Sequence, residues 1–261
     1  LKLYRKLMWL LVPKGAWEVV QIPYIRRVIR SGDVLEIEEY YTDERGPNYK
    51  GSYAPPDKEK KAEYIHRGRV RQLSRLINAN FKEGDLFVTL TFRKSISLAQ
   101  CRTDMINYLR RLKNRRVKLG LEPLKYIYVT ERGVLGRNKH HHLLLNDMPT
   151  DDVIELWKQG RVLISRLSPY ADYTGIANYI TKEDRPRNEK GWRRSHNLIV
   201  PRPQTVYLQP YADNIRLPAE CRGFHIVANE NYYGKGAGMR KYLRAVAPGG
   251  HDWGCGDELL L

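Results

Sequence analysis

The sequence has few of the features that mark several common classes of protein. Its three cysteines, Cys101, Cys221 and Cys255, are far apart and form no CxxC pair, which indicates free thiols in a reducing compartment rather than a disulfide framework. No apolar run approaches the roughly 20 residues of a membrane span. No GxxxxGKS or GxxxxGKT phosphate loop occurs, so an ATP site is not expected.

An apolar stretch near the start, residues 7–12, is flanked by basic residues and resembles the middle of a signal peptide. It is only six residues long, and no small-residue cleavage site follows it. We therefore expect a buried element here and a cytosolic protein. A chain that begins at Leu1 without Met is also expected to be a fragment or a processed chain.

The most prominent feature of the sequence is its excess of positive charge. Lys and Arg number 46 against 29 Asp and Glu, which gives a net charge of +17 and a pI near 9.8. Such a chain is expected to bind a polyanion, and nucleic acid is favoured because each neutralised phosphate releases counterions. An anionic membrane is the alternative, but it calls for a basic amphipathic helix with a Trp or Phe face, and the five Trp are scattered. Generic solubility is the third explanation.

Hydrophobic periodicity predicts an α+β fold. Strands are expected at residues 17–22, 24–30, 34–40, 86–92, 125–131, 140–146 and 161–167, and helices at 57–80, 97–118, 150–157 and 172–182. Hairpin spacing between the middle strands predicts a central, mostly antiparallel sheet with helices packed on it. We expect a β-rich N-terminal extension over residues 1–56, a core over 57–210, and a C-terminal extension over 211–261 that packs on the core.

Two of the predicted helices carry additional signals. In the helix at 57–80, a stripe that begins at Ala62 and Ile65 and ends at Ile77 is expected to be buried. At the start of the next helix, Ser97 followed by Gln100 matches a capping box.

A basic run covers residues 93–118, where nine Lys and Arg stand against one acid, Asp104. A solvated helix face explains most charge runs. The excess, together with the global charge, favours contact with DNA phosphates instead. The candidate DNA-binding residues are Arg93, Arg110, Arg111, Lys113, Arg115, Arg116 and Lys118.

Three consecutive histidines form the candidate metal site. On the strand predicted at 140–146, alternation puts His140 and His142 on one face and His141 on the other. Glu131 ends the neighbouring antiparallel strand, so a register that pairs the strand ends brings its carboxylate to the two imidazoles. A metal ion held by two His and one carboxylate keeps open coordination positions, which a substrate oxygen can occupy. A chance cluster of histidines is the alternative.

Tyr179 is the candidate nucleophile. At 100° per residue, the helix at 172–182 has an apolar face that includes Tyr173, which is expected in the core. Gly175 lies one turn before Tyr179 and leaves space beside the phenol, and Lys182 lies one turn after it on the same side. A phenol beside an ammonium group, near a metal, is a credible nucleophile for a phosphodiester. An amphipathic tyrosine at the rim of a packed helix is the alternative.

In this order and spacing, the motifs resemble those of the HUH endonucleases, which are named for a His-hydrophobic-His motif. Residues 87–92 (FVTLTF) resemble the first motif, Glu131 with residues 140–145 (HHHLLL) the metal motif, and residues 175–182 (GIANYITK) the single-tyrosine motif. The chain is most similar to the rolling-circle replication initiators of phages and plasmids, and residues 156–160 and 194–198 also resemble that branch. The resemblance covers roughly residues 24–210.

The resemblance implies a ferredoxin- or RRM-like sheet, with the metal site on one face and the tyrosine helix over it. It implies a nickase and strand transferase in which Tyr179, assisted by Lys182, attacks a DNA phosphate to give a 5′-phosphotyrosine and a free 3′-OH. Glu131, His140 and His142 would hold Mg²⁺ or Mn²⁺. The expected substrate is a single-stranded DNA origin with a hairpin, the partners are a host helicase and polymerase, and the location is the cytoplasm of a bacterial cell or phage-infected host.

Two departures from the family pattern and two other functions stay open. The middle residue of the metal motif is His141 rather than an apolar residue, and Gly175 stands where two-tyrosine members carry a second Tyr, so one nucleophile is expected. The nearer alternative is an HUH transposase or relaxase, although mobilisation relaxases usually place the tyrosine near the N-terminus. The farther alternative is a non-catalytic DNA-binding protein with a structural metal, which calls for a fourth ligand.

Overall fold

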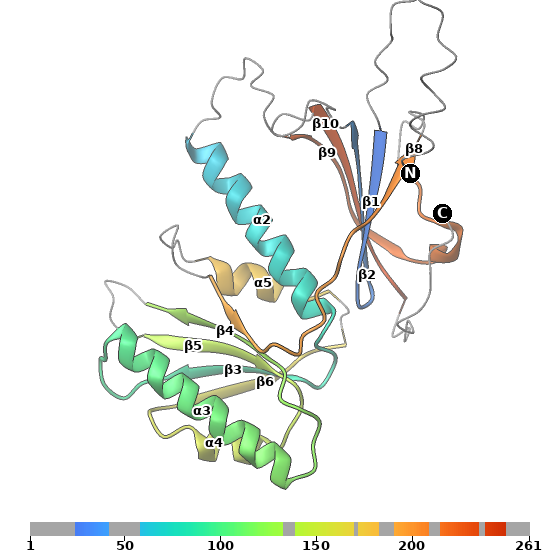
Figure 1. Ribbon diagram of the computed structural model, residues 1–261. Coiled ribbons are helices and arrows are strands. Elements are labelled where there is room, and N and C mark those ends of the chain that lie inside the picture. The colour runs from blue at the N-terminus through green and yellow to red at the C-terminus, as the bar shows by residue number, and fades with distance from the viewer. Residues whose placement is uncertain are drawn as a thin grey trace, which may run out of the picture.

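The computed structural model describes residues 24–41, 58–132, 139–169, 172–182, 191–208, 215–234 and 238–248. These residues form the predicted α+β fold, with two antiparallel five-stranded sheets (Figure 1). The strand predicted at 17–22, the apolar stretch at 7–12 and Cys255 lie outside the described residues. Among the described helices, none combines the length and the apolar character that crossing a membrane requires.

The central sheet has the strand order β6-β3-β5-β4-β7. Its strands are β3 (Leu86–Thr91), β4 (Tyr126–Glu131), β5 (His140–Leu145), β6 (Val162–Arg166) and β7 (Arg193–Arg194). All paired neighbours are antiparallel, as the hairpin spacing predicts. Because successive side chains on a strand point to opposite faces, each strand contributes to both layers that cover the sheet.

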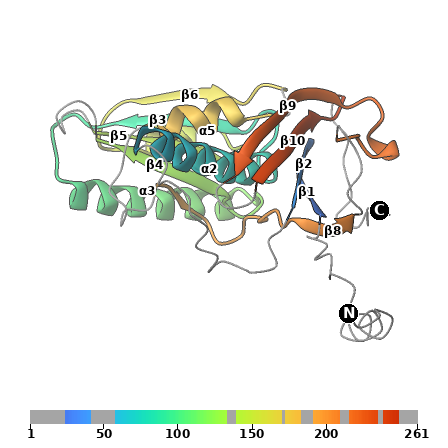
Figure 2. The same ribbon diagram turned by 90° about the horizontal axis from the view of Figure 1, so that it is seen from above.

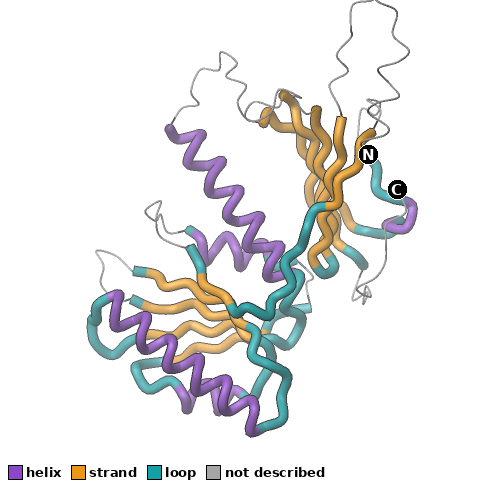
Figure 3. Tube along the Cα trace, in the orientation of Figure 1, coloured by secondary structure: helices purple, strands orange, loops and turns teal. Residues whose placement is uncertain are grey.

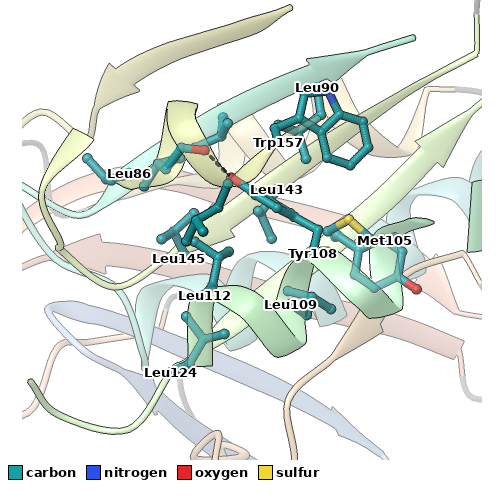
Figure 4. Close-up of a cluster of buried hydrophobic side chains, with 14 of the residues drawn as sticks. Leu86, Leu90, Met105, Tyr108, Leu109, Leu112, Leu124, Leu143, Leu145 and Trp157 are labelled. Atoms are coloured by element: carbon teal, nitrogen blue, oxygen red, sulfur yellow. Dashed lines mark hydrogen bonds between the residues drawn. The ribbon is translucent and has the colours of Figure 1, made fainter. Parts of the chain in front are cut away.

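One face of the central sheet packs against α3 (Leu98–Lys118) and α4 (Thr150–Leu156). The buried cluster there joins β3 and β5 to these helices (Figure 4). Each fully buried leucine contributes about 1.5–3 kcal/mol relative to an exposed one. The labelled members of the cluster are Leu86, Leu90, Met105, Tyr108, Leu109, Leu112, Leu124, Leu143, Leu145 and Trp157.

The other face of the central sheet packs against α5 (Thr174–Thr181) and the C-terminal half of α2 (Lys58–Asn78), as Figures 1 and 3 show. The predicted stripe of α2 is buried at Leu73 and Ile77, but Ala62 and Ile65 are exposed. The prediction is wrong for the first half of α2. This half of the helix extends beyond the central sheet, and no other described residue covers it there. In α3 the predicted cap is confirmed, since the Ser97 side chain accepts a hydrogen bond from the Gln100 backbone.

A second sheet, in the order β8-β1-β2-β10-β9, joins segments from both ends of the described chain (Figure 2). It contains β1 (Tyr24–Ser31), β2 (Val34–Tyr41), β8 (Gln204–Leu208), β9 (His225–Gly234) and β10 (Gly238–Val246). The turn between β1 and β2 contains Gly32 at φ 58°, where a Cβ would collide with the Asn78 backbone oxygen. The predicted N-terminal and C-terminal extensions therefore contribute strands to one sheet, an arrangement that sequence reasoning did not anticipate.

Charged side chains connect the second sheet to the helices on the central sheet. Arg75 of α2 contacts the buried carboxylate of Glu36 at 2.5 Å, and Arg71 contacts Glu38 at 3.3 Å. On β10, Arg244 reaches Asp172 at 2.5 Å. These contacts hold the second sheet beside α2 and beside the start of α5.

Candidate metal centre and tyrosine helix

Strand register brings the predicted metal ligands together. In the β4–β5 pair, Glu131 stands opposite His140, and Val129 stands opposite His142. This register pairs the strand ends, as expected from the sequence. The ligand atoms of Glu131, His140 and His142 all lie within 4.8 Å of one another, so the three residues could hold a metal ion.

The three side chains point their donor atoms at one point. Glu131 Oε2 lies 3.1 Å from His140 Nε2, and Glu131 Oε1 lies 3.3 Å from His142 Nε2. Glu131 is 6% exposed and His142 is 2% exposed, whereas His140 is half-buried. The group therefore opens to solvent on the His140 side, which is the side from which a substrate would enter.

The donor set fits a cation. Burial lowers the pKa of His142, so the imidazole is neutral at neutral pH and able to ligate a metal. Its Nδ1 lies 3.1 Å from Thr89 Oγ1, and a proton on Nδ1 that is donated to this hydroxyl leaves the Nε2 lone pair facing Glu131. Neither His142 Nε2 nor Glu131 Oε1 makes a hydrogen bond, although both are buried. With the proton on Nδ1, Nε2 and the Glu131 carboxylate face each other as two acceptors, and a bound cation would stabilise that arrangement.

Strand β3 supports this site from the opposite side of β5. Thr89 pairs with His142 and Thr91 pairs with His140 in the β3–β5 register. The Phe87 ring stacks on the His142 ring at 5.6 Å with an interplanar angle of 10°. The motif at residues 87–92 thus contributes alternate side chains to the metal-facing side of the sheet. Sequence reasoning recognised the motif but not that Thr89 orients a ligand, which only the register reveals.

Tyr179 lies directly over the metal group on α5. Its ring centroid is 5.1 Å from that of His142, and its side chain is 47% exposed. Lys182 Nζ lies 4.1 Å from the Tyr179 ring centroid and 3.5 Å from Glu131 Oε1. The structure therefore brings the candidate nucleophile, the candidate supporting lysine and the metal group into one cluster.

The other residues of α5 fit the predicted face. Tyr173 is buried and donates its hydroxyl proton to the Ser168 carbonyl, so it belongs to the core as predicted. A Cβ at Gly175 would meet nothing within 4 Å, so the side of α5 before Tyr179 is open. Tyr170, another tyrosine just before this helix, lies outside the described residues.

Asp172 and Arg244 fix the start of α5, and sequence reasoning missed both. Asp172 Oδ1 accepts hydrogen bonds from the backbone and the hydroxyl of Thr174, at 2.9 and 2.7 Å. Arg244 from the second sheet contacts the same carboxylate oxygen. The aspartate before the helix is a recognisable sequence signal, but a partner 72 residues later in the chain carries no local signal.

His141 points to the opposite face of the central sheet, as alternation predicts. It is 0% exposed, lies among the rings of Phe92, Tyr128 and Trp157, and its Nδ1 is 2.9 Å from Thr130 Oγ1. Burial lowers its pKa to about 4, so it is a neutral core side chain. The motif usually carries an apolar residue at this position. His141 can replace it because its neutral ring is buried in the core, as an apolar side chain would be.

The basic run lies mostly on α3, on the face of the central sheet opposite the metal group. Arg110, Lys113 and Lys118 are exposed there, and Arg93 is exposed just before the helix. These four residues remain predicted DNA contacts, but for DNA on a different side of the sheet from Tyr179. Nothing in the sequence signals this separation, because helix periodicity does not say which face of a sheet a helix covers.

The three other candidate arginines make contacts within the fold. Arg116 is 3% exposed and donates to the carbonyls of Glu122, Asn146 and Asp147, at 2.7, 3.1 and 2.7 Å. These bonds hold Arg116 inside the fold, which gives its guanidinium a structural role, and its DNA contact stays a prediction. Arg111 donates to the Leu156 carbonyl at 3.0 Å, and Arg115 pairs with Asp152 and Glu155. Both arginines join α3 to α4, so their guanidinium groups already have hydrogen-bond or ion-pair partners within the fold.

Comparison with protein families gives one match. Residues 85–184 match a family of replication-associated proteins of the ORF2 type. The matched stretch runs from β3 through α5, and so it contains the metal group and Tyr179. No curated protein and no solved structure matches significantly. The match confirms the resemblance of this part of the chain to replication-associated proteins and supports a role in the initiation of DNA replication.

Proposed function

We propose that the chain is a rolling-circle replication initiator that nicks single-stranded DNA at an origin through Tyr179. The observation that carries the proposal is the contact between the Tyr179 ring and His142, beside the convergent donors of Glu131 and His140. A half-exposed phenol and three metal-ligating side chains in one cluster suit attack on a phosphodiester. The match to replication-associated proteins supports DNA as the substrate.

The reaction balances with this chain's own nucleophile. Tyr179 Oη forms a bond to phosphorus while the bond from phosphorus to the 3′ oxygen breaks. The phenol proton passes to solvent, and the departing 3′ oxygen takes up a proton to become a free 3′-OH. The part of the strand downstream of the nick remains attached to the protein through its 5′ phosphate, as a phosphotyrosine, and a host polymerase extends the free 3′ end of the upstream part.

The metal group and Lys182 have separate tasks in this proposal. Glu131, His140 and His142 would hold Mg²⁺ or Mn²⁺, which when bound polarises a non-bridging phosphate oxygen. The Lys182 ammonium, 52% exposed and next to both Tyr179 and Glu131, supplies positive charge near the developing negative charge on the phosphate. Thr89 keeps the His142 imidazole in the tautomer that ligates through Nε2.

A single nucleophile distinguishes this chain from two-tyrosine initiators. The open position at Gly175 carries no second phenol on this helix. Strand joining would follow a second cleavage that frees a 3′-OH at the regenerated origin; this 3′-OH attacks the phosphotyrosine phosphorus, and the Tyr179 oxygen leaves and takes up a proton. A transposase or relaxase of the HUH type would use the same cluster, and the identity of the cleaved DNA separates these activities. A structural zinc site would need four ligands, and the described residues bring together three.

The deciding experiment is a cleavage assay on end-labelled single strands tiled across the DNA that surrounds the gene. With Mn²⁺ or Mg²⁺ we expect one cleavage position and an upstream fragment with a 3′ end that a polymerase extends. The downstream fragment, which keeps the strand's original 3′ end, should stay on the protein through its 5′ phosphate after boiling in detergent. A chelator should abolish cleavage without abolishing DNA binding. Binding without cleavage of any tiled strand, with Mn²⁺ present, would leave the non-catalytic alternative standing and overturn the proposal.

A further inference from the structure

A surface cavity of about 700 Å³ lies on the face of the central sheet that carries α3. Tyr126 and Tyr128 of β4 line it from the sheet, α3 lines one side, and the segment around β7 lines the other. It is distinct from the metal group: Glu131 is three residues beyond Tyr128 on β4, about 10 Å along the strand, and points to the opposite face. Its volume is in the range of cavities that bind small organic ligands.

The chemistry of the cavity is aromatic and basic. Its aromatic and basic residues are Arg102, Tyr126, Tyr128, Trp192, Arg193, Arg194 and His196, and no acidic residue is among the described residues that line it. Arg102 and Arg193 are exposed. The side chains on either side of Arg193 belong to the other face of the sheet, because Trp192 packs against the cluster beneath α5 and Arg194 stands opposite Ile127. Arg193 stands opposite Tyr128 in the β4–β7 register, so its guanidinium and that phenol ring belong to the same face. A planar ring set beside cations, without a carboxylate, suits a planar base that carries a phosphate.

Helix α3 extends the positive charge away from the cavity. Arg102, Ile106 and Leu109 line the cavity at helical spacing, and Lys113 follows Leu109 on the same side of the helix, exposed to solvent. A strand with one base in the cavity would therefore have its backbone continue along a cationic helix surface. A free nucleotide would make no use of that extension, which favours a strand as the ligand.

We infer that this cavity is a second binding subsite for single-stranded DNA, which holds one base and its phosphate on the face of the sheet opposite Tyr179. Stacking on Tyr126 would hold the base, Arg102 and Arg193 would hold the phosphate, and Lys113 would contact the neighbouring nucleotides. The subsite would anchor DNA flanking the cleavage position while the scissile phosphate lies at Tyr179. It does not depend on the nicking chemistry, because it requires neither the metal group nor the phenol.

The test measures DNA binding with the chemistry disabled. In a Tyr179→Phe background with a chelator, fluorescence anisotropy of a labelled oligothymidylate of about 20 nucleotides gives the affinity and its salt dependence. The double variant Arg102→Ala/Arg193→Ala should weaken binding and reduce the salt slope by roughly 1.4, at about 0.7 for each phosphate contact on a single strand. Tyr126→Ala should weaken binding by roughly five- to a hundredfold, as the loss of one base stack does.

A matched control separates local contacts from lost charge. Arg216→Ala/Arg222→Ala removes two exposed arginines outside the cavity and so changes the net charge equally. If this control weakens binding as much as Arg102→Ala/Arg193→Ala, the subsite assignment fails. A 4-thiothymidine-substituted oligonucleotide should cross-link to Tyr126 or to residues 191–196, and cross-links confined to α5 would also overturn it.

Two further readouts keep the result unambiguous. Thermal unfolding of each variant must match that of the parent, so that weaker binding does not reflect loss of fold. Thymidine monophosphate should compete only at concentrations far above those of the oligonucleotide. Equal affinity for the mononucleotide would assign the cavity to free nucleotides and contradict a strand subsite.

Discussion

The ring of Tyr179 and the ring of His142 are in edge contact, with centroids 5.1 Å apart and an interplanar angle of 67°. Tyr179 is on α5 and His142 is in the middle strand of the central sheet, so this contact joins the helix to the metal group. The start of α5 is fixed in turn by Asp172 and by Arg244 of the second sheet. The second sheet thereby takes part in setting the position of the phenol.

The phenol oxygen is the group on which the proposed chemistry depends. Tyr179→Phe removes that oxygen and keeps the ring contacts with His142 and Phe87, so DNA binding should be within about twofold of the parent while the covalent protein–DNA band disappears. Denaturing electrophoresis with labelled origin DNA and Mn²⁺ measures both. Tyr173→Phe is the control, because this hydroxyl donates to the Ser168 carbonyl away from the metal group, and the variant should keep the band. A band that persists in the Tyr179→Phe variant would identify another nucleophile.

The metal group should bind a cation in the absence of DNA. His140→Ala/His142→Ala removes two of three converging ligands, so Mn²⁺ binding measured by calorimetry should fall by at least about tenfold, and cleavage should be abolished. Far-UV circular dichroism should show the native content of helix and strand. His225→Ala, an exposed histidine on β9 away from both sites, is the control for the loss of an imidazole. Wild-type Mn²⁺ affinity in the double variant would show that the metal site is misassigned.

Arg116 should affect the stability of the fold. Arg116→Ala removes a buried donor from three carbonyls and leaves a cavity, and the free energy of unfolding should fall by roughly 2–4 kcal/mol. Lys113→Ala, three residues earlier on the exposed side of α3, should change it by less than about 0.5 kcal/mol. Urea unfolding measures both. Equal stability of the two variants would contradict the structural role of Arg116.

The sequence predicts most of the central sheet because its signals are local. Alternation in residues 86–92 and 140–146, and the pairing of Glu131 with His140 beside a hairpin, follow from strand geometry alone. Helix periodicity likewise separates Tyr173 from Tyr179 on α5. These are the parts in which each side chain's environment is set by its near neighbours in the chain.

The rest depends on contacts between distant segments. The pairing of β2 with β10 joins Val34 to Val246, and no local pattern specifies a partner that far along the chain. The same limit applies to Arg116, whose carbonyl partners lie in other loops, and to the side of the sheet on which α3 packs. A count of basic residues in a run therefore cannot tell a structural arginine from one that is available to DNA.

His141 gives a prediction about pH as well as about activity. Its pKa is about 4 in the folded chain against 6.5 when unfolded, so the unfolded state takes up a proton first as the pH falls. The stability from this group is present above about pH 6.5 and is lost as the pH falls from 6.5 toward 4. Between about pH 7 and pH 5 the loss should be on the order of 2 kcal/mol.

His141→Leu should remove this part of the acid sensitivity and keep metal binding and cleavage. The side chain faces Phe92 and Trp157 on the side of the sheet away from His142's donor atom, and leucine is the kind of residue that the motif usually carries there. Loss of the contact with Thr130 should lower stability at pH 7 by roughly 1 kcal/mol. Urea unfolding at about pH 7 and pH 5, beside a cleavage assay, measures all three effects. Burial also lowers the pKa of His142, and this residue remains in the variant. The difference in acid sensitivity between the parent and His141→Leu therefore isolates the contribution of His141. An identical loss of stability in both proteins would show that His141 is not buried in its neutral form.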